Sequence, residues 1–381
     1  MTNFDTPVAR FGTGAIKWDW FKDKDRDIIP MWVADMDFQS PPAVIDALKA
    51  RAEHGIFGYT WHTPELVQVV VERLQKLYKW QVHPEWLIWL PGLVSGLNVT
   101  CRAVGEIGDD VITSIPIYPP FLSAPKNQHR SLSKFAMIKQ NDRWEMDFEA
   151  FENAITPKTK LFILCNPHNP LGRIFSKDEL FAVARVCEKH DMIICSDEIH
   201  CDLLLDVDKP HIPTAALAPD IAERTIILMA PSKTFNIAGL GLSFALIPNE
   251  KLRKRFQQAM QGIVPHPNLF GYTAALAAFQ HGGEWLTALL DYLRDNERIV
   301  QERIQQIPGL ETTHVQATYL AWIDARELPT EGPHKFFLEA GVGLSNGLEF
   351  NGRGFVRLNF GCPRTMLIEA LDRMQHAVEK L

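Results

Sequence analysis

The sequence lacks three features that would each point to a large class of proteins. It has no basic excess, because 39 Lys and Arg stand against 46 Asp and Glu, a formal net charge of −7. A basic face for nucleic acid is therefore not expected. It also has no apolar run near the ~20 residues that cross a bilayer, and no repeat or low-complexity linker. We expect a soluble protein, without membrane or nucleic-acid partners, that acts on small molecules.

Metal-binding and redox motifs are missing as well. Six cysteines occur in 381 residues, and no two of them form a C-x-x-C pair, so neither a zinc site nor a thiol-redox site is expected. His62, His83 and His168 lack the spacing of metal ligands. Most of the cysteines lie in apolar stretches, which is typical of buried, reduced thiols. Since the first ten residues also lack the apolar core of a secretory signal, we expect a cytoplasmic protein without a metal.

Apolar runs alternate with segments of helical periodicity through the middle of the chain. The runs are rich in β-branched and aromatic residues and are predicted as strands at 86–90, 111–115, 161–165, 192–196 and 225–229. The clearest helices between them are predicted at 94–104, 177–190 and 250–261. This order predicts an α/β fold with a mainly parallel sheet sandwiched by helices. Ligands of such sheets bind at the carboxyl ends of the strands.

The pattern changes on both flanks of this region. Helices are predicted at 41–53, 64–80, 269–280, 284–306, 333–340 and from Pro363 onward, with strands at 318–323 and 354–359. We therefore predict a large domain at 48–267. A smaller α+β domain is expected from residues 268–381 with the N-terminal arm, residues 1–47.

Polar residues follow two of the predicted strands. In the string at 166–170, two X-Pro steps favour extended backbone and would hold Asn166 and Asn169 on a stiff loop, although a simple turn before a helix is the alternative. Asp197 ends another strand, where a buried carboxylate needs a positive partner such as a ligand cation. His200 can face the same ligand only if the strand ends there, and a histidine satisfied by the backbone is the alternative.

Lys233 follows the strand at 225–229. A lysine is most often a solvated surface residue, but Phe235 and Ile237 create apolar surroundings that would lower its pKa and favour Schiff-base chemistry. Ser232 beside it could offer a hydroxyl to a phosphate.

Asn169, Asp197 and Lys233, at successive strand ends, resemble the pyridoxal-phosphate enzymes of fold type I, the aspartate aminotransferase fold. The resemblance implies pyridoxal 5′-phosphate as the cofactor. It also implies that Lys233 binds the cofactor covalently and shuttles the Cα proton, that Asp197 pairs with the pyridine nitrogen, and that Asn169 donates to the phenolic oxygen. A carboxylate there would keep the ring nitrogen protonated, which makes the ring an electron sink.

Further positions match the same fold type. The string at 91–96 lies between a strand and a helix, so the N–H groups of Val94 and Ser95 would hold the phosphate together with Ser232. Tyr118 would stack on the ring, although a core tyrosine is the alternative. Tyr59 matches a tyrosine that reaches the phosphate of the neighbouring subunit, which implies a homodimer with active sites at the subunit interface.

Arg357 matches the arginine that binds the substrate α-carboxylate with two parallel hydrogen bonds. Without the resemblance, Arg357 would be expected at an exposed strand end, where the side chain of an arginine is usually solvated. Ala34 and Asn169 complete the substrate-binding residues that the resemblance implies.

A finer resemblance covers nearly the whole chain. The strings at 31–38, 196–200 and 359–364 are similar to those of the MalY/PatB branch, the cystathionine β-lyases and cysteine-S-conjugate β-lyases. His200 and Gly241 stand where ordinary transaminases carry a tyrosine and a phosphate-binding arginine. The implied activity is a carbon–sulfur β-lyase that converts cystathionine or related cysteine S-conjugates to thiol, pyruvate and ammonia.

Three other functions are alternatives to a β-lyase. An aminotransferase would share the cofactor and the site, and a regulatory protein could use the same scaffold to contact a partner. A nicotinamide-dependent oxidoreductase is disfavoured, because no glycine pair completes G-x-G-x-x-G between a strand and a helix.

Overall fold

The central sheet consists of the predicted strands and three more. The computed structural model describes residues 3–22, 27–330 and 332–381. The strands are β2 (Leu87–Leu90), β3 (Asp110–Ile115), β4 (Ser131–Gln140), β5 (Arg143–Met146), β6 (Thr159–Cys165), β7 (Ile193–Asp197), β8 (Thr225–Met229) and β9 (Ser243–Leu246). Their order is β2-β9-β8-β7-β6-β3-β4-β5. The five strands from β8 to β4 in this order are parallel, and antiparallel strands complete both edges.

Both faces of this sheet are covered by helices, which explains the continuous apolar runs. In β8, Ile226 and Leu228 pack on one side, while Ile227 and Met229 pack on the other. The first side is covered by α4 (Leu93–Ala103), α5 (Pro119–Asn127) and α9 (Glu250–Met260). The second side is covered by α3 (Pro64–Tyr78), α6 (Phe148–Asn153), α7 (Lys177–Lys189), α8 (Pro219–Ala222) and α10 (Leu269–His281).

A smaller antiparallel sheet lies in the C-terminal part of the chain. Its order is β10 (Glu311–Thr312), β11 (Leu320–Asp324), β14 (Phe355–Asn359) and β13 (Ser345–Asn346). The helices of this part are α11 (Gly283–Ile304), α12 (Pro333–Glu339) and α13 (Arg364–Val378). Together the two sheets confirm the predicted α/β class with a smaller α+β part.

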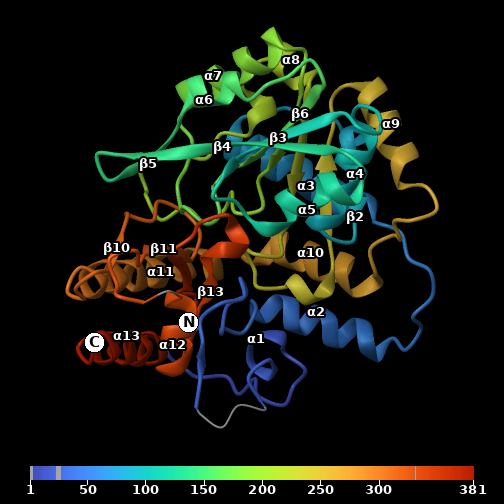
Figure 1. Cartoon of the computed structure of the whole chain (residues 1–381). Helices are drawn as coiled ribbons and strands as arrows, with labels where there is room; N and C mark the ends of the chain where they lie inside the picture. The colour runs from blue at the N-terminus through green and yellow to red at the C-terminus, as the bar shows by residue number, and fades with distance from the viewer. Residues whose placement is uncertain (1–2, 23–26, 331) are drawn as a thin grey trace.

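The N-terminal arm lies beside these C-terminal elements, blue next to red in Figure 1. It contains α1 (Ile16–Asp19), β1 (Ile29–Pro30) and the start of α2 (Pro42–Glu53), and β1 pairs in parallel with β12 (Val342–Gly343). Met31 and Met36 of the arm share one hydrophobic core with Leu358 and Phe360. The proposed domain limits, 48–267 against 1–47 with 268–381, stay a prediction.

Several predicted boundaries shift for local reasons. The helix predicted at 64–80 ends at Tyr78, because Lys79 is left-handed with a φ of 55°. The strand predicted at 318–323 begins at Leu320, because Thr318 has a φ of 78°. β4, β5 and β9 were not predicted. β4 is an example of the reason, since its apolar run at 135–138 is short and stands between the exposed residues Lys134 and Lys139.

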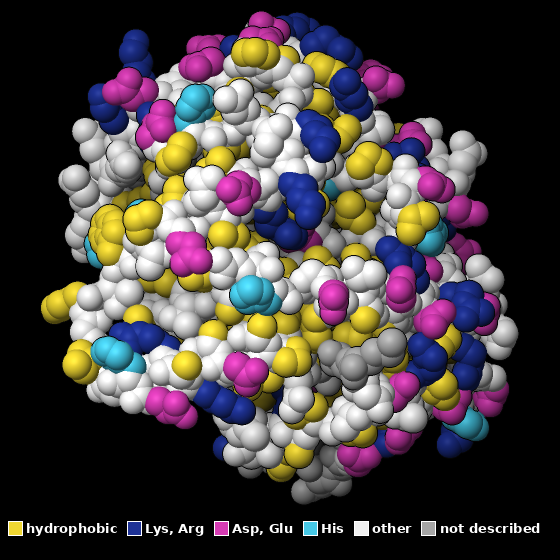
Figure 2. All heavy atoms as spheres, turned by 180° about the vertical axis from the view of Figure 1, so that it is seen from behind, with side chains coloured by type: hydrophobic (Ala, Val, Ile, Leu, Met, Phe, Trp, Pro, Cys, Tyr) yellow, Lys and Arg dark blue, Asp and Glu magenta, His cyan; other side chains and the backbone are white. Residues whose placement is uncertain are grey.

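The surface carries both signs of charge. Figure 2 shows Lys and Arg side chains interspersed with Asp and Glu over the face opposite to that of Figure 1. None of the helices in the described ranges has the length and apolar character that a membrane crossing needs.

A buried ion pair joins two parts of the arm to each other. The Lys17 side chain is fully buried, and its Nζ donates to Asp37 Oδ2 over 2.6 Å. Arg10 Nη1 and Trp18 Nε1 donate to the other oxygen over 2.7 and 2.8 Å. Burial by itself would raise the pKa of Asp37, but Lys17, Trp18 and Arg10 hold it below its ordinary value. Asp37 is therefore a charged group whose burial depends on its partners.

Lys17→Ala is expected to destabilise the protein by about 3 kcal/mol, because removal of one partner of a buried pair leaves a charge poorly compensated. Urea unfolding of the purified protein measures the change. The control is Lys254→Ala, which breaks an ion pair with Glu250 whose side chains are both 67% exposed; it should change stability by less than about 1 kcal/mol. Equal midpoints for Lys17→Ala and the unmodified protein would contradict the assigned role.

Candidate active site

Three parallel strands end side by side at one edge of the large sheet. β6, β7 and β8 are neighbours, and their register pairs Cys165 with Asp197 and Asp197 with Leu228. The loops that follow β6 and β8 carry Asn169 and Lys233. The structure thus brings the three predicted strand ends to one place, where parallel sheets bind their ligands.

Lys233 lies in the turn after β8. Its Nζ donates to the carbonyl oxygen of Ala34 over 2.6 Å. Burial lowers the pKa of Lys233 to about 8, with Arg357 adding to the effect while Asp35 and Asp197 oppose it. The predicted lowering of this pKa is confirmed. A lysine with such a pKa exists in part as the free amine near neutral pH, the form that attacks a carbonyl group.

Asp197 is the last residue of β7 and is buried. One carboxylate oxygen accepts a hydrogen bond from the Ile199 N–H over 3.1 Å. Burial, with a smaller contribution from Glu198, raises the pKa of Asp197 to about 7. No residue of the described chain forms an ion pair with this carboxylate within 4 Å. A cationic ring nitrogen of a ligand would supply the missing charge.

His200 lies in the turn after β7, because the strand ends at Asp197 as the sequence argument requires. The imidazole is buried, and its Nδ1 has no hydrogen-bond partner among the described residues. Burial lowers the pKa of His200 to about 3, with Lys233 and Arg357 contributing, so the ring is neutral. The Nδ2 of Asn166, at the end of β6, is buried without a partner too. Buried polar groups without partners at this edge of the sheet fit a ligand that carries hydrogen-bonding groups on its periphery.

Asn169 and Arg357 form the other side of the site. Arg357 Nη1 donates to Asn169 Oδ1 over 2.9 Å, and Nη2 donates to the Trp32 carbonyl over 2.8 Å and to Ser345 Oγ over 3.1 Å. The Nε of Arg357 is buried without a partner. The Tyr118 N–H donates to the Asn169 carbonyl over 3.2 Å, so Tyr118 lies next to the same loop. This group can bind an anion beside an aromatic ring.

The expectation that Arg357 lies at an exposed strand end is wrong. Arg357 is the central residue of β14, which runs between β11 and β13, and the residue is 4% exposed. The Phe350 ring lies 4.7 Å from its guanidinium carbon. Burial lowers the pKa of Arg357 to about 10, which still leaves the side chain charged near neutral pH. An arginine buried with its charge is suited to bind a carboxylate away from competing water.

Two of the predicted phosphate-binding residues, Val94 and Ser95, lie in the first turn of α4, and Ser232 lies in the loop after β8. The helix begins at Leu93, so the N–H groups of its first turn, those of Val94 and Ser95 included, lack partners within the helix. Val94 is exposed and Ser95 is half-buried. Ser232, next to Lys233, is also half-buried. These N–H and hydroxyl donors, at the positive end of a helix, suit a phosphate dianion.

Gly241 stands where the transaminases carry a phosphate-binding arginine. Its φ is 59°, in the left-handed region, and a Cβ at this position would lie 3.1 Å from the Pro91 carbonyl oxygen. A larger residue would be strained here. The backbone itself therefore accounts for the absence of that arginine.

Tyr59 is a predicted site residue that the structure does not bring to Lys233 or Ser232. It is fully exposed, in an extended segment between α2 and α3. None of the contacts recorded for the described residues connects Tyr59 with Lys233 or Ser232. Its predicted role depends on a second subunit.

Two residues of the C-terminal part that hold the arm against the site were not predicted from the sequence, Tyr319 and Asn359. Tyr319 Oη donates over 2.8 Å to the same Ala34 carbonyl that accepts from Lys233. Asn359 Nδ2 donates to the Val33 and Asp35 carbonyls over 2.5 and 2.7 Å. These bonds hold the backbone on both sides of Ala34 against the site. A sequence signal did exist, because the strings at 31–38 and 359–364 carry part of the family resemblance.

A second group behind the site was also missed. Asp202 accepts from Thr234 Oγ1 over 3.0 Å and from Arg73 Nη2 over 2.7 Å. Since Asp202 follows His200 by two positions and Thr234 follows Lys233, the carboxylate joins the two turns of the active site. No pattern in the sequence pairs these residues, which are 32 positions apart.

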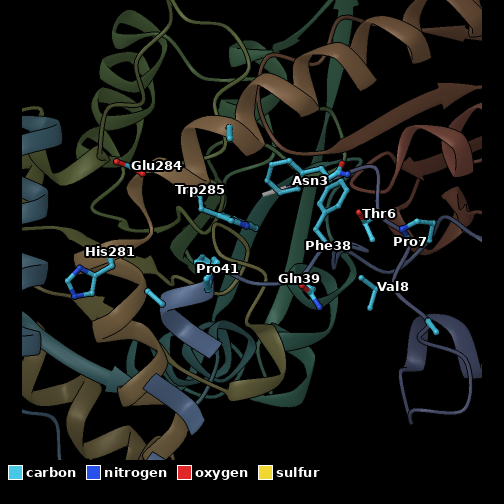
Figure 3. A pocket seen from close by; sticks show the side chains of 15 residues that line it. Asn3, Thr6, Pro7, Val8, Phe38, Gln39, Pro41, His281, Glu284 and Trp285 are labelled. Carbon is cyan, nitrogen blue, oxygen red and sulfur yellow. The ribbon is translucent and has the colours of Figure 1, made fainter. Parts of the chain in front are cut away.

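A separate cavity of about 910 Å³ lies between the arm and the start of α11 (Figure 3). Phe38 and Trp285 line its middle, and His281 and Glu284 lie at one end. The lining contains none of the predicted site residues, and we assign it no chemistry.

Comparisons with known proteins agree with this geometry. The sequence profile of the family described as "Aminotransferase class I and II" matches residues 26–374. Cystathionine beta-lyase PatB of Bacillus subtilis is 37% identical over 99% of this chain and 100% of its own length. Protein MalY of Escherichia coli is 33% identical over 99% of both chains.

A solved structure extends the agreement to the fold. The PLP-bound C-S lyase from Staphylococcus hominis is 33% identical, with a TM-score of 0.92 over 99% of this chain and 98% of that one. Sequence profile, full-length relatives and fold therefore agree. The chain belongs to the family of class I and II aminotransferases, in its MalY/PatB branch.

Proposed function

We propose that this protein is a pyridoxal-phosphate-dependent carbon–sulfur β-lyase, which cleaves cystathionine or a related cysteine S-conjugate to thiol, pyruvate and ammonia. The observation that carries the proposal is that two residues lie at the same edge of the sheet. One is Asp197, a buried carboxylate without an ion-pair partner, and the other is Lys233, a lysine of lowered pKa. The names of PatB and of the Staphylococcus hominis lyase support the same reaction type.

The cofactor is pyridoxal 5′-phosphate, and the polar groups at the site fit it. Lys233 would bind it covalently, Asp197 would pair with its ring nitrogen, and Asn169 and His200 would face its phenolic oxygen. Tyr118 would stack on its ring. The N–H groups of Val94 and Ser95, with Ser232 and the Tyr59 hydroxyl of a neighbouring subunit, would hold its phosphate. When bound, the cofactor stabilises the electron pair that remains at Cα after a proton leaves.

The side chains of this protein then account for the remaining steps. Arg357 binds the substrate α-carboxylate, and Ala34 and Asn169 border the same position. Lys233, released as a free amine, takes the Cα proton. The electron pair left at Cα forms a double bond to Cβ as the Cβ–S bond breaks and the thiolate leaves. Water then releases ammonia from the unsaturated product and leaves pyruvate.

The working unit proposed here is a cytoplasmic homodimer. Tyr59 is fully exposed on the single chain, and Ile56, Phe57 and Trp61 of the same segment are each more than 60% exposed. Burial of such a segment by a second subunit would remove apolar surface from water and bring Tyr59 to the neighbour's phosphate. All six cysteines are free and buried, which supports a reducing compartment.

The decisive experiment is incubation of the purified, cofactor-loaded protein with cystathionine. Pyruvate and free thiol should form in equal amounts, and Lys233→Ala should lower the rate on the order of 10³-fold or more, because it removes both the cofactor link and the base. The same variant should lose the yellow absorption of the lysine-bound cofactor. Lys254→Ala, at an exposed site, is the matched control and should keep both. Transfer of the amino group to a 2-oxo acid without pyruvate would instead identify an aminotransferase.

The pH dependence of cofactor uptake tests the electrostatics of Lys233. In the apoprotein, covalent binding should become faster as pH rises through about 8, because only the deprotonated amine reacts. Arg357→Gln should move this midpoint to higher pH, since the arginine charge lowers the pKa of Lys233. Arg326→Gln, at an exposed arginine, should leave it in place. A midpoint that Arg357→Gln leaves unchanged would contradict the assignment.

A further inference from the structure

Two turns of the active site lie past the ends of neighbouring parallel strands, β7 and β8. The backbone hydrogen bonds between these strands reach Glu198, whose N–H donates to the Leu228 carbonyl over 2.8 Å. Beyond this point, no backbone hydrogen bond within the described ranges joins the turn after β7 to the turn after β8. The distance between the two turns, which carry His200 and Lys233, therefore depends on side-chain contacts.

A buried side-chain hydrogen bond joins the two turns. Asp202 lies five residues past the end of β7, and Thr234 lies five residues past the end of β8. Thr234 Oγ1 donates to Asp202 Oδ2 over 3.0 Å. Thr234 is 0% exposed and the Asp202 side chain is 8% exposed, so water competes little for this bond. A hydrogen bond to an ionised carboxylate is also stronger than one between two neutral groups.

Arg73 of α3 holds the other oxygen of the same carboxylate. Its Nη2 donates to Asp202 Oδ1 over 2.7 Å, and its guanidinium carbon lies 5.4 Å from the centre of the Phe279 ring of α10. Burial by itself would lower the pKa of Arg73, but the Asp202 carboxylate raises it above the ordinary value of an arginine. Because each oxygen has its own donor, the carboxylate is fixed with respect to the helices on that face of the sheet.

The Lys233 turn is held by side chains on two of its residues. Asn236 holds the N-terminal arm: its Oδ1 accepts from the Met36 N–H over 2.9 Å, and its Nδ2 donates to the Met36 and Phe38 carbonyls over 2.9 and 2.8 Å. Thr234, the residue after Lys233, holds the turn after β7. The first link places the arm against the lysine, and the second link places the lysine with respect to the end of β7.

We propose that Asp202 is a positioning residue: through Thr234 it holds the Lys233 turn at a fixed distance from Asp197 and His200, so that one cofactor ring can reach all three side chains. Groups that act together on one ligand have to stay within about 0.5 Å of their productive positions. This inference rests on the proposed function, because it takes Lys233 and Asp197 to contact the same cofactor. Asp202 acts through Thr234 and needs no contact with the cofactor or the substrate.

The test measures the affinity of the apoprotein for pyridoxal 5′-phosphate, from the absorption of the lysine-bound cofactor. Thr234→Val keeps the branched shape without the hydroxyl and should weaken this affinity about tenfold, since a hydrogen bond to a charged group is lost. It should also lower kcat for pyruvate formation about tenfold and leave KM within about twofold, because Arg357 is unchanged. Thr234→Ser keeps the hydroxyl and should restore most of the affinity and of kcat.

The matched control is Thr225→Val, at the opposite end of β8. Thr225 is also 0% exposed, and its Oγ1 donates to the Ile221 carbonyl over 2.6 Å. The control therefore loses a buried threonine hydrogen bond from the same strand. It should lower the urea midpoint as Thr234→Val does, but keep the cofactor affinity and kcat. Equal losses of affinity in the two variants would show that stability alone is responsible, and would overturn the inference.

A double variant tests whether Asp202 and Thr234 act as one link. Asp202→Ala should weaken the cofactor affinity at least as much as Thr234→Val, and addition of Thr234→Val to it should cause no further loss, since the bond is already absent. Losses that multiply, or an unchanged affinity in Thr234→Val, would overturn the inference. Failure of the lyase function is a different result: the unmodified enzyme would form no pyruvate, while the affinities would still decide the role of Asp202.

Discussion

The active site depends on one electrostatic constraint, the charge of Asp197. A carboxylate buried at the end of a parallel strand is stable only with a positive partner, and no residue in the described ranges forms an ion pair with it. Its pKa, raised to about 7 by burial, describes a group that lacks its counter-charge. In the proposed function, a cofactor with a cationic ring nitrogen would supply that charge, and in return the carboxylate would keep the ring protonated. Binding of the cofactor and its reactivity thus have the same cause.

The second constraint is closure of the site by the N-terminal arm. The backbone around Ala34 accepts hydrogen bonds from Lys233, Tyr319 and Asn359. This segment reaches the site because β1 pairs with β12 and because the Asn236 side chain bonds the backbone of Met36 and Phe38, while the buried pair of Lys17 and Asp37 joins two parts of the arm to each other. The arm therefore belongs to the active site although it lies far from the lysine in sequence.

Much of the site could be predicted because its residues follow apolar runs. Runs such as 225–229 are visible in the sequence, since each is buried on both faces, and the chemistry of Lys233 was inferred from its position after one of them. Residues that depend on contacts between distant segments could not be found in this way. Asp202 and Thr234 join two turns, and Arg357 was misplaced at an exposed strand end. Its burial results from the strands on both sides of β14, and the local sequence does not specify them.

The sequence by itself determined the fold class and the family and predicted the reacting residues, because periodicity and strand-end motifs are local properties of the chain. Only the tertiary structure decided which charges are isolated and which are paired. The lone carboxylate of Asp197, the neutral imidazole of His200 and the burial of Arg357 are set by distances between segments far apart in the chain. Arg357 and Trp32, for example, are 325 positions apart. Desolvation and Coulomb interactions depend on those distances, so no local pattern could specify them.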